Sequence, residues 1–197
     1  MTPPLIDVLR SSGALKEGHF LLASGRHSGQ YVEKFDLLRN PSATQQACAQ
    51  FAAEFRDQRI DVVAGPTTGG VILAFETARQ LAVAAAYAER VSEGQSAREF
   101  RRGTTFAPGS RVLLVDDILT TGGSVRETLT ALAAHPVELV AVGVLVDRSG
   151  GRVDFGVPLF SLCELDIATW IAEECPMCAA GIPLVKPGTT AKPGGAA

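Results

Sequence analysis

The sequence has little that would tie it to a membrane or to the outside of a cell. Its longest apolar run, around residues 137–146, is interrupted by Glu138 and is too short to cross a bilayer. The first residues lack the basic start and apolar core of a secretory signal. Four cysteines among 197 residues are typical of a reducing compartment rather than of a disulfide scaffold. We therefore expect a cytoplasmic protein with no membrane partner.

Positive charge is also scarce. The formal net charge is −3 and the isoelectric point is about 5.6, which argues against a nucleic-acid binder that relies on bulk charge. Hydrophobic residues make up 46% of the chain and charged residues 20%, so we expect a packed core, and the length suits one domain. We predict no nucleic-acid partner, although a local basic site is compatible with this composition.

Apolar runs alternate with segments of helical spacing along the chain. The runs predict strands at residues 60–65, 82–89, 111–117 and 138–147, with a helix as the alternative for the alanine-rich second run. Helices are predicted at residues 42–58, 69–82 and 124–135, the last with Ser124 and Glu127 as a capping box. Strands that are apolar throughout and separated by helices predict an α/β fold, a parallel sheet flanked by helices.

Residues 112–125, VLLVDDILTTGGSV, place two adjacent aspartates at the end of a predicted strand. Ligands of parallel α/β sheets bind beyond the carboxyl ends of the strands, where Asp116 and Asp117 should lie. Residues 120–124 then form a turn into a helix N-terminus, which can bind an anion through its backbone N–H groups. A phosphorylated sugar fits this pattern. The alternative is an ordinary strand–turn–helix whose two acids are solvated.

The same stretch resembles the phosphoribosylpyrophosphate (PRPP) motif of the type I phosphoribosyltransferases. Residues 18–41, 64–82, 100–117 and 146–151 further resemble the orotate phosphoribosyltransferases of that family. The resemblance implies transfer of phosphoribose from PRPP to orotate with Mg²⁺, giving orotidine 5'-monophosphate and pyrophosphate for UMP biosynthesis. It also implies a homodimer and a single domain over residues 1–185, in which residues 1–40 and 150–185 contribute a small hood. Residues 186–197 should be a disordered tail.

Site residues follow from the resemblance by position. It implies catalytic roles for Asp116, Asp117 and Arg90, and a loop at residues 89–103 that closes over the site. Contacts to PRPP are implied for Thr67, Thr68, Gly69, Gly70, Arg90, Asp116, Asp117, Thr120, Thr121, Gly122, Gly123 and Ser124. Contacts to orotate are implied for Ser24, Arg26, Thr120 and Arg148.

Arg148 also stands out on its position alone. It follows the predicted strand 138–147, so it should lie at the same sheet edge as the two aspartates. A guanidinium can pair a carboxylate through two parallel hydrogen bonds, and a carboxylate is what distinguishes orotate from uracil. The alternative is that Arg148 pairs with Asp147 and only holds the turn.

The sequence departs from the family pattern at three places where lysine or histidine is expected. Gly69 and Ala23 stand at two lysine positions, and no lysine or histidine follows Arg90 in the predicted loop. Arg98, Arg101 and Arg102 are candidate substitutes. These departures leave two alternatives open: a phosphoribosyltransferase that salvages a purine or uracil, and a non-catalytic PRPP-binding regulator. A regulator should carry a DNA-binding surface, and no helix-turn-helix-like segment or basic arm is evident.

Residues 175–181, CPMCAAG, resemble half of a zinc knuckle. Tetrahedral zinc needs four ligands, and no second C-x-x-C is present, so a site would need Cys48, Cys163 or another subunit. His19, His27 and His135 are scattered along the sequence. We predict a structural turn here and no metal held by protein side chains.

Overall fold

The central strands form where the sequence is apolar at nearly every position. The computed structural model describes residues 3–92 and 94–187. Its main sheet has the order β5-β4-β3-β6-β7-β8. Five strands are parallel: β4 (Ala84–Arg90), β3 (Val62–Pro66), β6 (Ser110–Leu119), β7 (Val137–Asp147) and β8 (Leu159–Glu164). The predicted α/β class is confirmed, and the alanine-rich run is a strand.

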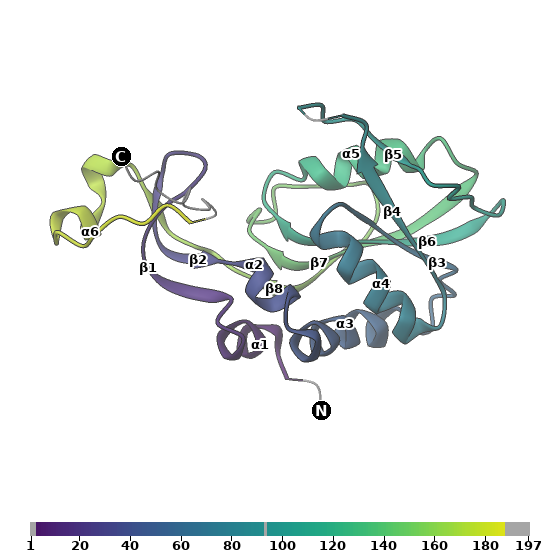
Figure 1. The fold of residues 1–197 in the computed structure, drawn as a ribbon, viewed down its shortest axis with the longest axis horizontal. Coiled ribbons are helices and arrows are strands. Elements are labelled where there is room, and N and C mark those ends of the chain that lie inside the picture. Colours follow the sequence, from purple (N-terminus) through teal and green to yellow (C-terminus); the bar gives the residue numbers. More distant parts are fainter. Residues whose placement is uncertain (1–2, 93, 188–197) are drawn as a thin grey trace, which may run out of the picture.

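Helices cover both faces of this sheet (Figure 1). The helices α3 (Pro41–Phe55) and α4 (Gly69–Leu81) lie on one face, and α5 (Gly123–Leu132) lies on the other. Phe51 and Phe55 of α3 contact Phe160 of β8, with ring centroids 6.3 and 5.7 Å away, which fixes this helix against the sheet. Within the described part of the chain, no helix is both long and apolar enough to cross a membrane.

The order of the strands creates a crevice between two loops. From β3 the chain passes through α4 to β4 on one side, whereas β6 lies on the other side of β3 and continues through α5 to β7. The loops that follow β3 and β6 therefore diverge at the carboxyl edge of the sheet. Such a switch in strand order is where open α/β sheets bind their ligands.

The long polar stretch at residues 89–109 is more ordered than its sequence indicates. The strand β5 (Arg98–Phe100) pairs antiparallel with β4, which places Arg98 opposite Arg90. Phe106 is buried and contacts Phe100 edge to face. These contacts hold the base of the stretch against the sheet.

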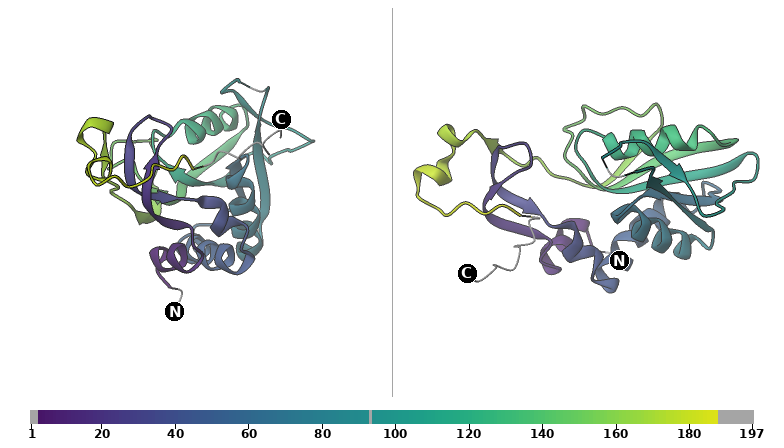
Figure 2. Two further views of the ribbon diagram at one scale, coloured as in Figure 1. Left: turned by 60° about the vertical axis from the view of Figure 1, so that its left-hand side comes forward. Right: turned by 45° about the horizontal axis from the view of Figure 1, so that its top comes forward.

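A second, smaller sheet lies beside the main body. We use the name hood for this sheet together with the C-terminal segment that covers it. It consists of β1 (Leu15–Leu21), β2 (His27–Val32) and β9 (Thr169–Trp170), all antiparallel. The C-terminal segment adds the 3₁₀ helix η1 (Ala172–Glu174) and α6 (Pro176–Ala179), and both views of Figure 2 show it lying against the β1–β2 hairpin. Phe20 forms a β-bridge with Val185.

The predicted boundaries of the hood were too wide. The strand β8 lies in the main sheet although it falls within residues 150–185. The helices α1 (Leu5–Ser11) and α2 (Lys34–Leu38) pack against α3, so they belong to the main body. The hood is therefore limited to residues 15–32 and 169–185. Most of the predicted tail, residues 188–197, lies outside the described residues.

Candidate active site

Two adjacent carboxylates are buried at the switch point. Asp116 and Asp117 are only 4% and 5% exposed, so the alternative of a solvated acid pair is wrong. The side chain of Asp116 accepts hydrogen bonds from the Asp117 N–H (2.8 Å) and from Ser124 Oγ (2.5 Å). Asp117 Oδ1 accepts a hydrogen bond from the Ile118 N–H (2.7 Å). These bonds fix both carboxyl groups at the end of β6.

Ionising both buried acids at once is energetically unfavourable. Burial, and then the neighbouring charge of Asp117, raise the pKa of Asp116 to about 6, while the bond from Ser124 opposes this rise. A carboxyl group whose pKa is raised in this way is stabilised in its ionised form by a nearby cation. The pair is therefore suited to a ligand that brings hydroxyl donors or a metal ion.

Lys34 is a site residue that the sequence did not reveal. Its Nζ lies 2.8 Å from Asp117 Oδ2 and 3.0 Å from Oδ1, at the start of α2. The pair joins positions 83 residues apart, and no local pattern links them. Lys34 brings a cation to a site in which the sequence alone suggested too few lysines.

The loop after β3 approaches Asp117 so closely that it leaves no room for a side chain. A Cβ atom on Gly69 would lie 1.9 Å from Asp117 Oδ2. The absence of a lysine at this position is therefore a steric requirement of the observed site. Thr67 and Thr68, which precede Gly69, carry the hydroxyl groups of this loop, and a cis peptide bond joins them.

Arg98 supports the same loop from β5. Its buried guanidinium donates to the carbonyl oxygen of Thr67 (3.3 Å) and to Thr67 Oγ1 (3.1 Å), and it pairs with Glu127 at 3.0 Å. The two other candidate arginines point elsewhere, because Arg101 pairs with Glu99 and Arg102 with Glu89. Of the three proposed substitutes, only Arg98 reaches the site.

The turn that follows the aspartates begins α5 with a glycine rather than a capping box. Gly122 is the N-cap, with φ at +80°, and a Cβ on it would come within 3.0 Å of Val153. The predicted cap is wrong because Ser124 Oγ is engaged with Asp116, and Glu127 pairs with Arg98. The turn thus leaves its backbone N–H groups at a helix N-terminus, where an anion can bind.

A cavity of about 330 Å³ joins the two loops. It brings together seven residues of the predicted PRPP set, namely Thr67, Thr68, Arg90, Asp116, Asp117, Thr120 and Ser124, and adds Lys34 and Arg98. The other members of that set, Gly69, Gly70, Thr121, Gly122 and Gly123, lie in the same two loops or at the helix starts that follow them.

Arg148 lies at the end of β7 beside a separate cavity of about 130 Å³, which Asp147 also lines. Burial lowers the pKa of Arg148. Within the described residues, its Nε atom and the adjacent Ser149 Oγ are buried without a hydrogen-bond partner. The alternative pairing with Asp147 is not seen, because Asp147 Oδ1 accepts from the Ser149 N–H at 2.6 Å.

Two other predicted orotate contacts lie in the hood. The Arg26 guanidinium donates to Thr169 Oγ1 (2.8 Å) and to the Thr169 carbonyl oxygen (2.7 Å), which ties the β1–β2 turn to β9. Ser24 Oγ accepts a weak bond from the Arg26 N–H at 3.4 Å. The structure therefore does not bring Ser24 and Arg26 together with Thr120 and the acid pair.

A buried acid pair, a hydroxyl-rich turn at a helix N-terminus and a second loop across a switch point define a site for a phosphorylated sugar. The chain belongs to the phosphoribosyl transferase domain family, whose model matches residues 36–175.

Similar proteins include orotate phosphoribosyltransferases and adenine phosphoribosyltransferases. The orotate phosphoribosyltransferase of Caldicellulosiruptor bescii is 46% identical over 95% of this chain and 97% of its own length. The crystal structure of the orotate phosphoribosyltransferase from Aeropyrum pernix is 31% identical, covers 82% of this chain and 93% of its own, and has a TM-score of 0.67. The adenine phosphoribosyltransferase of Saccharomyces cerevisiae, at 20% identity, 80% and 99% coverage and a TM-score of 0.65, shares the fold.

Proposed function

We propose that this protein is an orotate phosphoribosyltransferase, which converts orotate and PRPP to orotidine 5'-monophosphate and pyrophosphate in UMP biosynthesis. The relatives that match it over nearly their whole length carry that name. The structural observation that carries the proposal is the group of unpartnered polar atoms after β7, Arg148 Nε and Ser149 Oγ. Buried polar groups without partners are costly, and a bound carboxylate would satisfy them.

The acid pair is proposed to hold the ribose of PRPP. Asp116 and Asp117 would accept hydrogen bonds from the 2'- and 3'-hydroxyls, while residues 120–124 would bind the 5'-phosphate. The C1'–oxygen bond to pyrophosphate breaks as the ring nitrogen of orotate bonds to C1', and the sugar passes through a state resembling an oxocarbenium ion. Carboxylates below the ribose favour that positive charge.

The departing pyrophosphate needs donors and positive charge. The loop at residues 67–70 would supply hydroxyl and backbone N–H donors, and Arg98 holds that loop in place. Arg90 and Lys34, which both line the cavity, would supply the charge. Lys34 pairs with Asp117, so ribose binding to that carboxylate would release the ammonium toward the pyrophosphate.

The donor set of the cavity also fits Mg²⁺. Carboxylate and hydroxyl oxygens line it, and neither cysteine nor histidine does within the described residues. Oxygens of PRPP and water would bind the ion, and Asp116 and Asp117, which accept from the ribose hydroxyls, would add the negative charge that keeps it in the cavity. When bound, Mg²⁺ neutralises the charge that develops on the leaving group.

A homodimer is proposed from an apolar surface formed by α2, α3 and α4. Phe75 is 65% exposed at a cavity of about 380 Å³ that is also lined by Leu38, Pro41, Val71 and Ile72. An exposed aromatic surrounded by aliphatic groups is typical of an association surface. Phe75→Glu should convert the dimer to a monomer in sedimentation experiments. Glu54→Gln, on the exposed side of α3, should leave the dimer intact.

The decisive experiment for the reaction supplies PRPP and Mg²⁺ with orotate, uracil, adenine or hypoxanthine in turn, and measures pyrophosphate and the nucleotide formed. We expect turnover with orotate alone. Turnover with uracil or a purine would favour the salvage alternative, and PRPP binding without turnover of any base would favour the regulator.

A further inference from the structure

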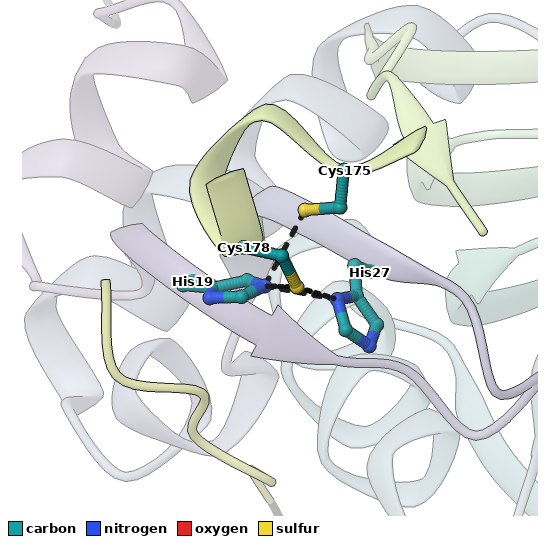
Figure 3. A group of neighbouring side chains, drawn as sticks. All are labelled: His19, His27, Cys175 and Cys178. Atoms are coloured by element: carbon teal, nitrogen blue, oxygen red, sulfur yellow. Dashed lines mark hydrogen bonds between the residues drawn. The ribbon is translucent and has the colours of Figure 1, made fainter. Parts of the chain in front are cut away.

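Four metal-ligating side chains meet in the hood, away from the cavity that holds the acid pair. His19 lies on β1, His27 begins β2, Cys175 is the N-cap of α6, and Cys178 lies within that helix (Figure 3). One ligand atom from each lies within 4.8 Å of every other. From the sequence, a metal site here needed Cys48, Cys163 or another subunit, but the fold instead brings two histidines to the cysteine pair from the opposite end of the chain.

The distances between the ligand atoms approach those of a tetrahedral site. His19 Nε2 lies 3.4 Å from Cys175 Sγ and 3.7 Å from Cys178 Sγ, and His27 Nδ1 lies 3.3 Å from Cys178 Sγ. A zinc ion bound ~2.0–2.1 Å from nitrogen and ~2.3 Å from sulfur sets tetrahedral ligand atoms roughly 3.3–3.8 Å apart. The two ring nitrogens, 2.9 Å apart, need to separate only slightly.

The hydrogen bond on the far side of His19 prepares its ring for a metal. Nδ1 lies 2.7 Å from the carbonyl oxygen of Ile182. A carbonyl can only accept, so Nδ1 carries the proton and Nε2 presents its lone pair to the cluster. A histidine that donates its second ring N–H to a backbone carbonyl is the usual outer-shell arrangement of metal ligands, because it fixes both tautomer and orientation.

The charge and burial of the cluster suit a divalent ion. His19, His27 and Cys175 are buried, at 2%, 6% and 2% exposure. Two cysteine thiolates and two neutral imidazoles carry two negative charges, so a divalent cation makes the group neutral. Four protein ligands leave no open position, which is typical of a structural rather than a catalytic zinc site.

The hood needs such a contribution because it lacks an apolar core of its own. Among the described residues, none of the three hydrophobic clusters includes a residue from 19–29 or 169–185. Ile171, Ile182 and Leu184 are instead 42–46% exposed. Small units with little core usually depend on disulfides or a structural metal.

We propose that His19, His27, Cys175 and Cys178 bind one zinc ion that joins the C-terminal segment to the β1–β2 hairpin. Binding replaces the two thiol protons, which are released to water, and forms four bonds to the ion. The ion fixes α6 against the hairpin. It also restrains β9, which precedes α6 in the chain, pairs with β2 and accepts a hydrogen bond from Arg26. It thereby holds the hood as one unit beside the main sheet.

The test measures metal on the full chain, made without an affinity tag in a zinc-supplemented reducing cytosol. We expect about one zinc per chain by plasma mass spectrometry. Replacement by Co²⁺ should give the visible bands of tetrahedral cobalt together with thiolate-to-cobalt charge transfer. Neither readout uses substrates, so failure here is distinguishable from failure of the proposed reaction.

Matched variants localise the ion. Cys178→Ser changes an exposed ligand and should lower the zinc content at least tenfold, whereas Cys163→Ser, outside the cluster, should leave it unchanged. Wild-type metal content and the cobalt spectrum decide the matter even if Cys178→Ser does not fold. The proposal is overturned by wild-type protein without zinc, by bound iron instead, by a Cys175–Cys178 disulfide in freshly purified protein, or by full zinc retention in Cys178→Ser.

Discussion

The sheet-edge cavity and the hood cluster both bury polar groups gathered from distant parts of the chain, but they balance charge differently. In the cavity, Lys34 pairs with Asp117, whereas Asp116 accepts a hydrogen bond from Ser124, and burial together with the charge of Asp117 raises its pKa to about 6. In the hood, two thiols and two imidazoles converge on one point with a tautomer already set. The comparison separates a site that remains incomplete until a substrate binds from one that a single ion completes.

The largest expected effect concerns Arg148, which has a buried atom without a partner. Arg148→Ala should raise the KM for orotate, costing about 2–4 kcal/mol or roughly 30–1000-fold, if the guanidinium pairs a desolvated carboxylate. The KM for PRPP and the melting temperature should change little. Arg148→Lys should recover part of the loss, because lysine cannot form two parallel bonds.

Steady-state kinetics with each substrate varied in turn checks this prediction. If orotate use by Arg148→Ala equals that of the wild type, the residue only shapes the turn after β7. Its role would then be structural, like the role proposed for the hood cluster.

The pH dependence of stability should distinguish Asp116 from other acids. Its pKa is raised from an ordinary value near 3.8 to about 6, so the folded state holds the proton more tightly than the unfolded state. Stability from this group is fully present below about pH 4 and is lost as pH rises to about 6, on the order of 3 kcal/mol for an isolated carboxyl. Asp116→Asn should remove this decline.

Thermal unfolding of wild type and Asp116→Asn between pH 4 and 8 measures the difference. An identical pH profile for the two proteins would show that the pKa of Asp116 is not raised in the folded state. The proposed electrostatic difference between the cavity and the hood would then be wrong.

Loss of either acid should weaken PRPP use without unfolding the protein. Asp116→Asn and Asp117→Asn should each lower kcat/KM for PRPP by about 1.5–3 kcal/mol, or roughly 10–150-fold, because each removes a charged acceptor. Titration calorimetry with PRPP and Mg²⁺ gives the binding part of this loss. Unchanged kinetics in both variants would contradict the assignment of the acid pair to ribose.

The smallest effect is expected at the tip between β4 and β5. Limited proteolysis should cut there, and PRPP with Mg²⁺ should slow the cut by closing the tip over the cavity. Cleavage in the hood serves as the internal control, because bound PRPP should not alter its rate. A cut between β4 and β5 that ignores the ligands would contradict loop closure.

Local pattern was enough to predict four strands of the main sheet (β3, β4, β6 and β7) and the three helices that cover it, but not β5, β8 or the strands of the hood. Apolar runs define β3, β6 and β7, and the two acids after such a run lie where the topology places ligands. Lys34 was missed because its partner lies 83 residues away. The capping box was predicted wrongly because Ser124 and Glu127 have tertiary partners that outcompete the local motif.

The hood illustrates the same limit more strongly. Cys175 and Cys178 were visible as a pair, but His19 lies 156 residues from Cys175, and no periodicity links them. The pairing of β2 with β9, the bridge between Phe20 and Val185 and the bonds from Arg26 to Thr169 bring the two ends of the chain together. Contacts of this range are set by the packed fold rather than by any short segment.

The close approach of Gly69 to Asp117 also restricts how this site can evolve. Gly69→Lys would drive its Cβ into the Asp117 carboxylate, so a lysine at this position requires a prior rearrangement of that acid. Lys34 in turn depends on Asp117 staying where it is. The three positions therefore form an epistatic set, and grafting a lysine from a relative into this loop should inactivate the enzyme unless the partner positions change with it.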